Sequence, residues 1–168
     1  MNLVLLATAV FLPMVIEAYL SRRNEARLRA RRAVEPAGDV YAVMQIAYPA
    51  AFIVILVEGI VRGPRIDVVV AAGFTVLVGA KLLKYWAILT LGERWAFRVL
   101  VLPGTPLVAA GPYQLVRHPN YVAVLGELVG AALIARAPVT GVGAVVGFGW
   151  LLLKRVRIEE IALGLRRS

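Results

Sequence analysis

The segment from Gly111 to Tyr121, GPYQLVRHPNY, contains an arginine, the only histidine of the chain and two tyrosines. A second group of ionisable side chains, Arg155, Glu159 and Glu160, follows near the end of the chain. In an apolar setting such side chains are costly unless they meet a ligand or one another. The two segments together therefore predict a binding or catalytic site.

The second group has the spacing of an anion-binding helix face. Arg155 and Glu159 are four residues apart, so they share one face of a helix. The planar guanidinium of an arginine can hold a carboxylate through two parallel hydrogen bonds. Arg157 lies on a different face, and the sequence leaves open whether Arg155 or Arg157 meets the ligand.

The rest of the chain has the composition of a membrane protein. Of its 168 residues, 61% are hydrophobic, against about 45–50% in soluble domains. The formal charge of +9 does not indicate nucleic-acid binding, because the basic residues lie between apolar stretches and not along one soluble face. With no cysteine and one histidine, the chain excludes disulfides, thiol catalysis and a thiolate or multi-histidine metal site.

The apolar stretches predict an all-α, single-domain integral membrane protein, because about 20 helical residues cross the hydrocarbon core of a bilayer. Three spans form an N-terminal part, residues 1–91, and residues 92–168 hold the polar loop, a helical hairpin and a short cytoplasmic tail helix. The five predicted spans are Asn2 to Leu20, Val40 to Val61, Ile66 to Leu91, Tyr121 to Ala135 and Val139 to Leu153.

The N-terminal part also predicts the orientation in the membrane. The first span carries Glu17, has no basic segment before it and is followed by arginines, so we expect a retained helix and not a cleaved signal peptide. The loop from Ser21 to Asp39 is rich in arginine, whereas the next turn holds only two. By the positive-inside rule this loop is cytoplasmic and the N-terminus is outside, which places both halves of the predicted site in the cytoplasm.

Glycines predict how the last two spans pack. Gly126 and Gly130 are four residues apart, and so are Gly143 and Gly147. Small residues at this spacing let helix backbones approach closely in lipid. We therefore expect a tight antiparallel hairpin whose open end brings the two halves of the predicted site together.

The GPY-x3-RHP-x-Y pattern, the hairpin, Arg155 and the EE-x-x-L pattern at Glu159 to Leu163 together resemble the isoprenylcysteine carboxyl methyltransferase family and its bacterial relatives. The resemblance implies an integral-membrane methyltransferase that uses S-adenosylmethionine as methyl donor. Its specific motifs lie in the C-terminal part, and the first three spans match only in kind.

The resemblance implies two groups of site residues. Arg155 and Glu159 would lie on the substrate side as catalytic residues. The cofactor site would be formed by the side chains of His118, Tyr121 and Glu160 and by the backbone of Gln114, Leu115 and Val116. Methyl transfer from a sulfonium is an in-line displacement, so positioning and desolvation are expected to supply most of the rate.

The chain departs from the family pattern in two respects. The family commonly continues after EE-x-x-L with a longer, aromatic-containing tail, but here only Gly164 to Ser168 follow. One wall of the usual cofactor pocket is therefore missing or supplied by another segment. Ala123 stands where a glycine often follows the tyrosine by two residues.

Glu127 lies inside the fourth predicted span, where an ionisable group is a functional candidate by default. As a catalytic base it would accept a proton from a weakly acidic hydroxyl, which resembles bacterial relatives that O-methylate polyketide lipids such as alkylpyrones. The alternative is a structural hydrogen bond to a neighbouring helix.

Two further predictions concern charged residues in the first three spans. Lys81 and Lys84 are expected to be anchors that reach the membrane surface. Glu58 and Arg62 are expected to pair across one helical turn.

The resemblance thus implies a methyltransferase, dependent on S-adenosylmethionine, that methylates a carboxylate or hydroxyl oxygen of an isoprenoid or long-chain acceptor. Oxygen is favoured over nitrogen because an arginine beside the acceptor suits an anion and would repel an amine headgroup. The expected partners are membrane lipids and a lipophilic or lipidated acceptor, in a bacterial inner or plasma membrane. The alternatives are a phospholipid N-methyltransferase, a sterol-type reductase, and a non-catalytic scaffold or small transporter.

Overall fold

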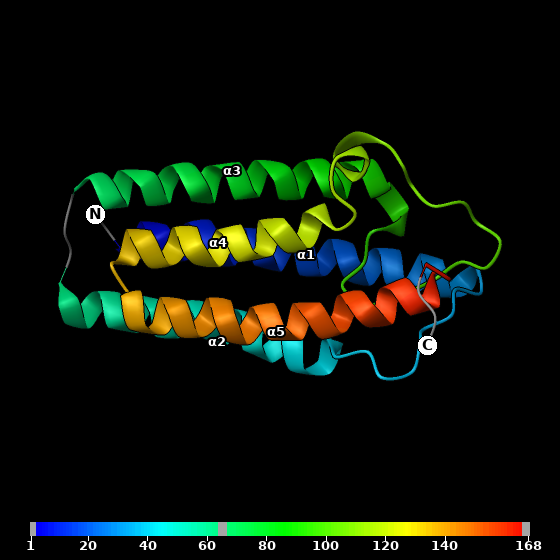
Figure 1. Cartoon of the computed structure of the whole chain (residues 1–168), viewed down its shortest axis with the longest axis horizontal. Helices are drawn as coiled ribbons and strands as arrows, with labels where there is room; N and C mark the ends of the chain where they lie inside the picture. The colour runs from blue at the N-terminus through cyan, green and yellow to red at the C-terminus, as the bar shows by residue number, and fades with distance from the viewer. Residues whose placement is uncertain (1–2, 64–66, 166–168) are drawn as a thin grey trace.

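Five α-helices run along the long axis of one bundle in a computed structural model that describes residues 3–63 and 67–165 (Figure 1). They are α1 (Leu3–Ala30), α2 (Tyr41–Arg62), α3 (Val68–Leu91), α4 (Pro119–Ala135) and α5 (Pro138–Ala162), with 3-10 helices η1 (Gly92–Arg94) and η2 (Gly111–Gln114). Within the described ranges there is no β-strand, and one isolated β-bridge pairs Val34 with Val101. The all-α prediction is confirmed.

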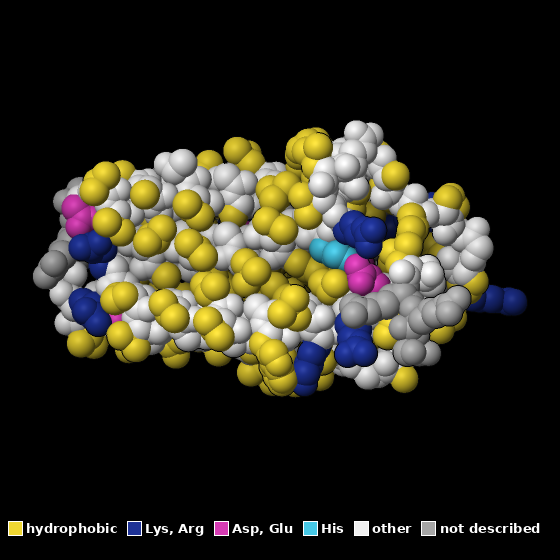
Figure 2. Space-filling model, viewed as in Figure 1, with side chains coloured by type: hydrophobic (Ala, Val, Ile, Leu, Met, Phe, Trp, Pro, Cys, Tyr) yellow, Lys and Arg dark blue, Asp and Glu magenta, His cyan; other side chains and the backbone are white. Residues whose placement is uncertain are grey.

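Four of the helices, α1, α2, α3 and α5, are long and apolar enough to cross a membrane, whereas α4 has only 17 residues. Large apolar side chains on these four helices are exposed, and they cover the middle of the bundle in Figure 2. An exposed apolar surface of this extent marks contact with lipid. The chain is therefore an integral membrane protein, while the number of five spans stays a prediction.

Two helices extend beyond the predicted spans. α1 continues past Leu20 to Ala30, because the arginine-rich segment that follows contains no glycine or proline up to that point. α5 continues through Lys154 to Ala162 without a break, so the prediction of a separate tail helix is wrong. The predicted span and tail residues that lie outside the described ones are Asn2, Ile66 and residues 166–168.

Carboxylates fix where two of the helices begin. Asp67 Oδ1 accepts hydrogen bonds at 3.0 and 3.1 Å from two backbone N–H groups in the first turn of α3. Near the end of α2, Glu58 accepts hydrogen bonds from the backbone N–H and the hydroxyl of Thr140, at 2.7 and 2.6 Å. Glu58 also pairs with Arg62 at 2.6 Å, as predicted. One carboxylate thus caps α5 and ties its start to the end of α2.

α4 lies within the bundle and packs closely on α3. A Cβ atom added to Gly130 would lie 2.7 Å from the backbone nitrogen of Leu77, and one added to Gly126 would also meet α3. A Cβ on Gly143 or Gly147 would meet nothing within 4 Å. Gly126 and Gly130 therefore face α3 and not α5, whereas the close contact between α4 and α5 lies at Gly141, where an added Cβ would be 2.5 Å from the Cβ of Ala132. The spacing shows that two backbones can approach and does not say which helix is the neighbour.

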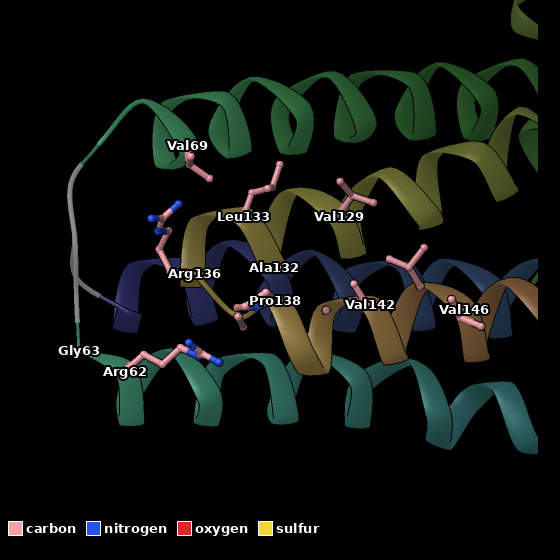
Figure 3. Close-up of a pocket in the computed structure, with 13 residues that line it drawn as sticks. Arg62, Gly63, Val69, Val129, Ala132, Leu133, Arg136, Pro138, Val142 and Val146 are labelled. Carbon is pink, nitrogen blue, oxygen red and sulfur yellow. The ribbon is translucent and has the colours of Figure 1, made fainter.

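The two ends of the bundle differ. The turn between α4 and α5, the end of α2 and the start of α3 lie at one end, where these four helices border a cavity of about 740 Å³. Apart from Arg62 and Arg136, the cavity is lined by apolar side chains and glycines, and none of the predicted site residues is among them (Figure 3).

The opposite end, called the loop end here, carries segments 31–40 and 95–118 together with the last turns of α1 and α5 (Figure 1). α1 holds the second of these segments in place. The Asn24 amide donates to the backbone oxygen of Trp95 at 2.8 Å, and Ser21 Oγ accepts from the backbone N–H of Phe97 at 2.8 Å. The helical extension of α1 therefore positions the polar loop.

Candidate functional site

The two halves of the predicted site are in contact at the loop end. The Tyr121 hydroxyl, in the first turn of α4, donates to Glu159 Oε2 near the end of α5 at 2.6 Å. His118 Nε2 lies 3.4 Å from Glu160 Oε1, and the His118 ring stacks on the Tyr121 ring with centroids 5.4 Å apart. Because α4 begins at Pro119 and runs antiparallel to α5, its first turn meets the last turns of α5.

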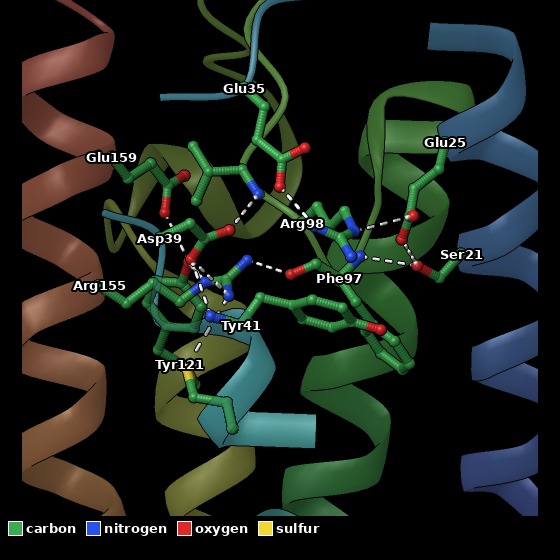
Figure 4. A network of polar contacts seen from close by, with 12 residues as sticks. Ser21, Glu25, Glu35, Asp39, Tyr41, Phe97, Arg98, Tyr121, Arg155 and Glu159 are labelled. Atoms are coloured by element: carbon green, nitrogen blue, oxygen red, sulfur yellow. Dashed lines mark hydrogen bonds and ion pairs between the residues drawn. The ribbon is translucent and has the colours of Figure 1, made fainter. Parts of the chain in front are cut away.

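Arg155 connects this contact to the loops. The residue is only 5% exposed. Its Nε donates to the Tyr121 hydroxyl at 2.9 Å, its Nη1 lies 3.3 Å from Asp39 Oδ1, and its Nη2 donates to the backbone oxygen of Phe97 (Figure 4). One guanidinium thus holds α4, the segment before α2 and the segment after η1. We call Arg155, Asp39, Tyr121, Glu159 and His118 the Arg155 cluster.

Asp39 is a member of this cluster that the sequence reasoning missed. Besides Arg155, its carboxylate accepts backbone hydrogen bonds from Val99 at 3.1 Å and from Tyr41 at 3.2 Å. Its separation from Arg155 is 116 residues, so no local spacing connects them. The one available signal was an acid placed just before a predicted helix, a position that commonly caps the helix.

A further set of ion pairs surrounds the cluster on the loop side (Figure 4). Arg98 Nη1 lies 2.6 Å from Glu35 Oε1, and its guanidinium lies over the Tyr41 ring at 4.6 Å from the centroid. Burial acts to raise the pKa of Glu35, but hydrogen bonds from Arg98 and Arg29 outweigh burial and lower that pKa below the ordinary 4.5. Glu35 therefore stays ionised at neutral pH and ties segment 31–40 to segment 95–118.

A cavity of about 650 Å³ adjoins the Arg155 cluster, within the range of about 300–1,000 Å³ typical of ligand pockets. Its wall combines parts of α2 and segment 95–118 with the start of α4 and the end of α5. The lining residues that carry polar groups include Tyr48, Lys84, Tyr113, His118, Tyr121, Arg155 and Glu159.

Two buried polar atoms on this wall have no hydrogen-bond partner among the described residues. They are Nε1 of Trp95, an N–H donor, and Oδ1 of Asn120, an acceptor. Native structures rarely leave buried polar atoms unpaired. Both residues line the cavity, so the unpaired donor and the unpaired acceptor are candidates for contacts with a bound ligand.

Residues 71–164 match the model of the Isoprenylcysteine carboxyl methyltransferase (ICMT) family, which is more than half of the chain. The chain belongs to this family. Membership indicates a membrane methyltransferase that acts on a lipidated substrate, and ICMT family members in general depend on S-adenosylmethionine. The match begins in α3, well before the motifs that carried the resemblance in the sequence.

Two bacterial proteins are similar to the chain over most of their length. Uncharacterized protein YpbQ of Bacillus subtilis (strain 168) is 28% identical over 159 residues, which cover 95% of each chain. An Uncharacterized protein of Haemophilus influenzae is 25% identical over 145 residues, or 86% of this chain and 84% of that protein. No solved structure matches the chain.

The cavity separates the site residues implied by the family resemblance into two sets. His118, Tyr121, Arg155 and Glu159 line it, whereas Glu160 contacts His118 without being part of the wall. The remaining members of the implied cofactor site, Gln114, Leu115 and Val116, are exposed and do not line the cavity. The roles of both sets stay predictions.

The structure also separates the two arginines between which the sequence left the choice open. Arg155 lines the cavity, whereas Arg157 is exposed and does not.

On the adjoining loop, burial raises the pKa of Tyr113, and the charge of Glu159 raises it further. The Tyr113 hydroxyl is therefore neutral and serves the cavity as a hydrogen-bonding group.

A second group of charges, the inner cluster, lies between the helices and consists of Glu17, Tyr48, Lys81, Lys84 and Glu127. Lys84 Nζ lies 2.6 Å from Glu17 Oε2 and 3.3 Å from Glu127 Oε2. Lys81 Nζ lies 3.0 Å from Glu127 Oε1, and the Tyr48 hydroxyl donates to Glu127 Oε2. Lys84 is 2% exposed, so its predicted role as a surface anchor is wrong. Carboxylates on α1 and α4 neutralise its charge inside the bundle, which local spacing did not indicate.

Proposed function

We propose that this protein transfers a methyl group from S-adenosylmethionine to an oxygen atom of an isoprenoid or long-chain acceptor taken from the bilayer. The observation that carries the proposal is the position of the Arg155 cluster. In a chain of the ICMT family, its residues His118, Tyr121, Arg155 and Glu159 line a cavity of about 650 Å³.

The residues around the cavity suit this cofactor. Its sulfonium and amino groups are cationic, and the Glu159 carboxylate on the cavity wall supplies negative charge. Its carboxylate, hydroxyl and adenine groups need hydrogen-bond partners, and Trp95 Nε1 and Asn120 Oδ1 are unpaired among the described residues. When bound, the cofactor supplies an electrophilic methyl group.

Arg155 is proposed to position the acceptor. Its guanidinium is now paired with Asp39 at 3.3 Å, so an anionic acceptor at this place would compete with Asp39 for the same donors. Arg155 also donates to the Tyr121 hydroxyl, which in turn donates to Glu159, and this chain fixes the orientation of both groups. A guanidinium at the acceptor favours an oxygen anion over a cationic amine headgroup.

We infer that the loop end faces the cytoplasm of a bacterial inner or plasma membrane and that the N-terminus lies outside. The arginines of the last turns of α1 are at the same end as the cavity, and cytoplasmic loops carry the excess of arginine and lysine. A water-soluble methyl donor would then enter from the cytoplasm and the lipophilic acceptor sideways from the bilayer.

The experiment that tests the proposal is methyl transfer from labelled S-adenosylmethionine. The purified protein in detergent is incubated with the labelled donor and a total bacterial lipid extract, and labelled products are identified by mass spectrometry. We expect a lipid methylated on oxygen. A product methylated on nitrogen would overturn the proposal. So would the absence of any labelled lipid from protein that does bind the donor.

Cofactor binding is measured separately by calorimetry. His118→Ala and Glu160→Ala should weaken binding of S-adenosylmethionine by at least about tenfold, the loss expected when a charge-assisted hydrogen bond is removed. Arg157→Ala is the matched control, because Arg157 is exposed and does not line the cavity. Unchanged affinity in both test variants would contradict the assignment of the cofactor site.

A further inference from the structure

The cavity of about 740 Å³ at the end of the bundle away from the loop end has no part in the proposed methyl transfer. We call it the apolar cavity. Its floor is formed by α4, from which Val129 and Leu133 line it, and α3 and α5 border it on either side (Figure 3). Val122 excepted, every residue of α4 is buried or half-buried, so this helix lies recessed between its two neighbours.

The apolar cavity opens at the surface of the bundle. Val142 and Val146 of α5 line it and are nevertheless 65% and 67% exposed. At about 1.5 Å per residue, the lining residues from Pro138 to Val146 extend about 12 Å along α5. One leaflet of a bilayer has a hydrocarbon depth of about 15 Å, half of the whole core. The cavity therefore begins at the end of the bundle and has a length that suits the acyl chain of a lipid in that leaflet.

The lining residues that carry a charge are both arginines. Arg62 is the last residue of α2, and Arg136 directly follows α4, so both lie at the end of the bundle. Their guanidiniums pair with Glu58 at 2.6 Å and with Asp67 at 3.2 Å. Neither carboxylate lines the cavity, however. The apolar cavity therefore combines an apolar interior with positive charge at its outer end.

Both arginines have donors left for a further anion. Asp67 also accepts hydrogen bonds from the first turn of α3, and Glu58 accepts from the backbone N–H and the hydroxyl of Thr140. Among the described residues, each of the two guanidiniums pairs with one carboxylate, although a guanidinium carries five N–H donors. A phosphate group can accept two parallel hydrogen bonds from one such guanidinium.

Anchoring at the membrane surface does not by itself account for these arginines. Arginines near the ends of spans commonly reach the headgroup region. Positive residues are, however, concentrated on the cytoplasmic side, which we infer to be the loop end at the other side of the bundle. An anchor also requires no cavity beside it. Two arginines above an open apolar cavity match instead the two parts of an anionic lipid.

We propose that the apolar cavity binds one anionic phospholipid, with an acyl chain along α4 between α3 and α5 and its phosphate at Arg62 and Arg136. A zwitterionic phospholipid would also bring its cationic group to the two guanidiniums, so it should bind more weakly. The bound lipid would join the end of α2 to the turn between α4 and α5. Because this site lies at the opposite end from the Arg155 cluster, it does not depend on the proposed methyl transfer.

The test measures lipid binding by native mass spectrometry of the purified protein in an uncharged detergent. The probes are dioleoylphosphatidylglycerol, which is anionic, and dioleoylphosphatidylcholine, which is zwitterionic. We expect one tightly bound phosphatidylglycerol per protein, with an affinity at least about tenfold above that for phosphatidylcholine, the size of a hydrogen bond to a charged group. Arg136→Gln should remove this preference. Arg23→Gln is the matched control, because it removes the same charge from an exposed position of α1 at the loop end and should leave the tight site unchanged.

A second pair of variants keeps every charge and changes only the cavity. Val142→Trp fills the apolar cavity and should abolish tight binding of phosphatidylglycerol. Val139→Trp is its control, because Val139 lies on the same helix, is 69% exposed and does not line the cavity. Unfolding midpoints in detergent without lipid verify that each variant is folded, and Val142→Trp decides alone if Arg136→Gln does not fold.

Three results would overturn the proposal. The first is equal affinity of the unaltered protein for the two lipids. The second is unchanged binding of phosphatidylglycerol by Val142→Trp, which would mean that a headgroup contact exists without the cavity. The third is a dimer in detergent that Val142→Trp converts to a monomer while lipid binding stays the same, because the cavity would then be covered by a second copy of the chain.

Discussion

The inner cluster and the Arg155 cluster are both buried groups of charges, but they are built from different kinds of segment. All members of the inner cluster come from helices, and their partners are side chains. Arg155 instead contacts Asp39 in the segment before α2 and the backbone oxygen of Phe97 in segment 95–118. Loops can move when a ligand binds, whereas packed helices hold their geometry. The comparison teaches that burial of charge alone does not identify a binding site, and that only the Arg155 cluster combines a place beside the cavity with contacts to loop segments.

The largest expected effect is on the inner cluster. Lys84→Met removes the ammonium between Glu17 and Glu127 and leaves buried carboxylates short of a partner, which typically costs about 3–5 kcal/mol. We expect a much lower midpoint of thermal unfolding in detergent, followed by circular dichroism. Lys81→Met is the matched control and should cost less, because its side chain is 16% exposed against 3% for Lys84. A wild-type midpoint for Lys84→Met would show that the cluster does not stabilise the bundle.

The Arg155 cluster should respond in activity more than in stability. Arg155→Lys keeps the charge but loses the planar guanidinium with its paired N–H donors. Turnover on an oxygen acceptor should therefore fall roughly 10- to 1000-fold, as when one positioned hydrogen-bond donor is removed from an active site. The affinity for S-adenosylmethionine, measured by calorimetry, should change little. Arg157→Lys, at an exposed position, should behave as the unaltered protein. Full turnover of Arg155→Lys would contradict a role for Arg155 at the acceptor.

The contact between α3 and α4 supports the inner cluster, because Lys84 and Glu127 lie on these two helices. Gly130→Ala places a Cβ 2.7 Å from a backbone nitrogen of α3 and should destabilise the protein by about 1–3 kcal/mol. Gly143→Ala is the control, since its Cβ would meet nothing within 4 Å, and it should leave the unfolding midpoint unchanged or raise it. If Gly143→Ala destabilised the protein more than Gly130→Ala did, Gly143 and not Gly130 would face a helix.

The smallest expected effect concerns the ion pairs beside the Arg155 cluster. The pKa of Glu35 is lowered in the folded protein, because its hydrogen bonds with Arg98 and Arg29 outweigh burial. Its contribution is therefore fully present above the ordinary 4.5 and is lost as the pH falls through the lower folded value. We expect Glu35→Gln to cost about 0.5 kcal/mol at neutral pH, as for partly exposed pairs, and progressively less as the pH falls below 4.5. Unfolding midpoints measured from neutral to acidic pH test this, and a cost that does not fall with pH would contradict it.

Features that depend on composition or on local spacing were predictable from the sequence. Long apolar stretches can satisfy their backbone groups in lipid only as helices or closed barrels, and their length here favours helices. The Glu58–Arg62 pair follows from residues four apart on one helix. The GPYQLVRHPNY segment and the two glutamates also marked the candidate site, because polar groups in an apolar chain need partners.

Other features were decided only by the tertiary structure, because they depend on which helices are neighbours. Lys84 is buried since carboxylates from α1 and α4 meet it, and Gly130 faces α3 because α4 packs there. Asp39 pairs with Arg155 from 116 residues away. A periodic pattern describes the face of one helix and contains no information about what lies opposite. The candidate site residues were therefore recognisable from local sequence, whereas their partners and the cavity between them were set by packing.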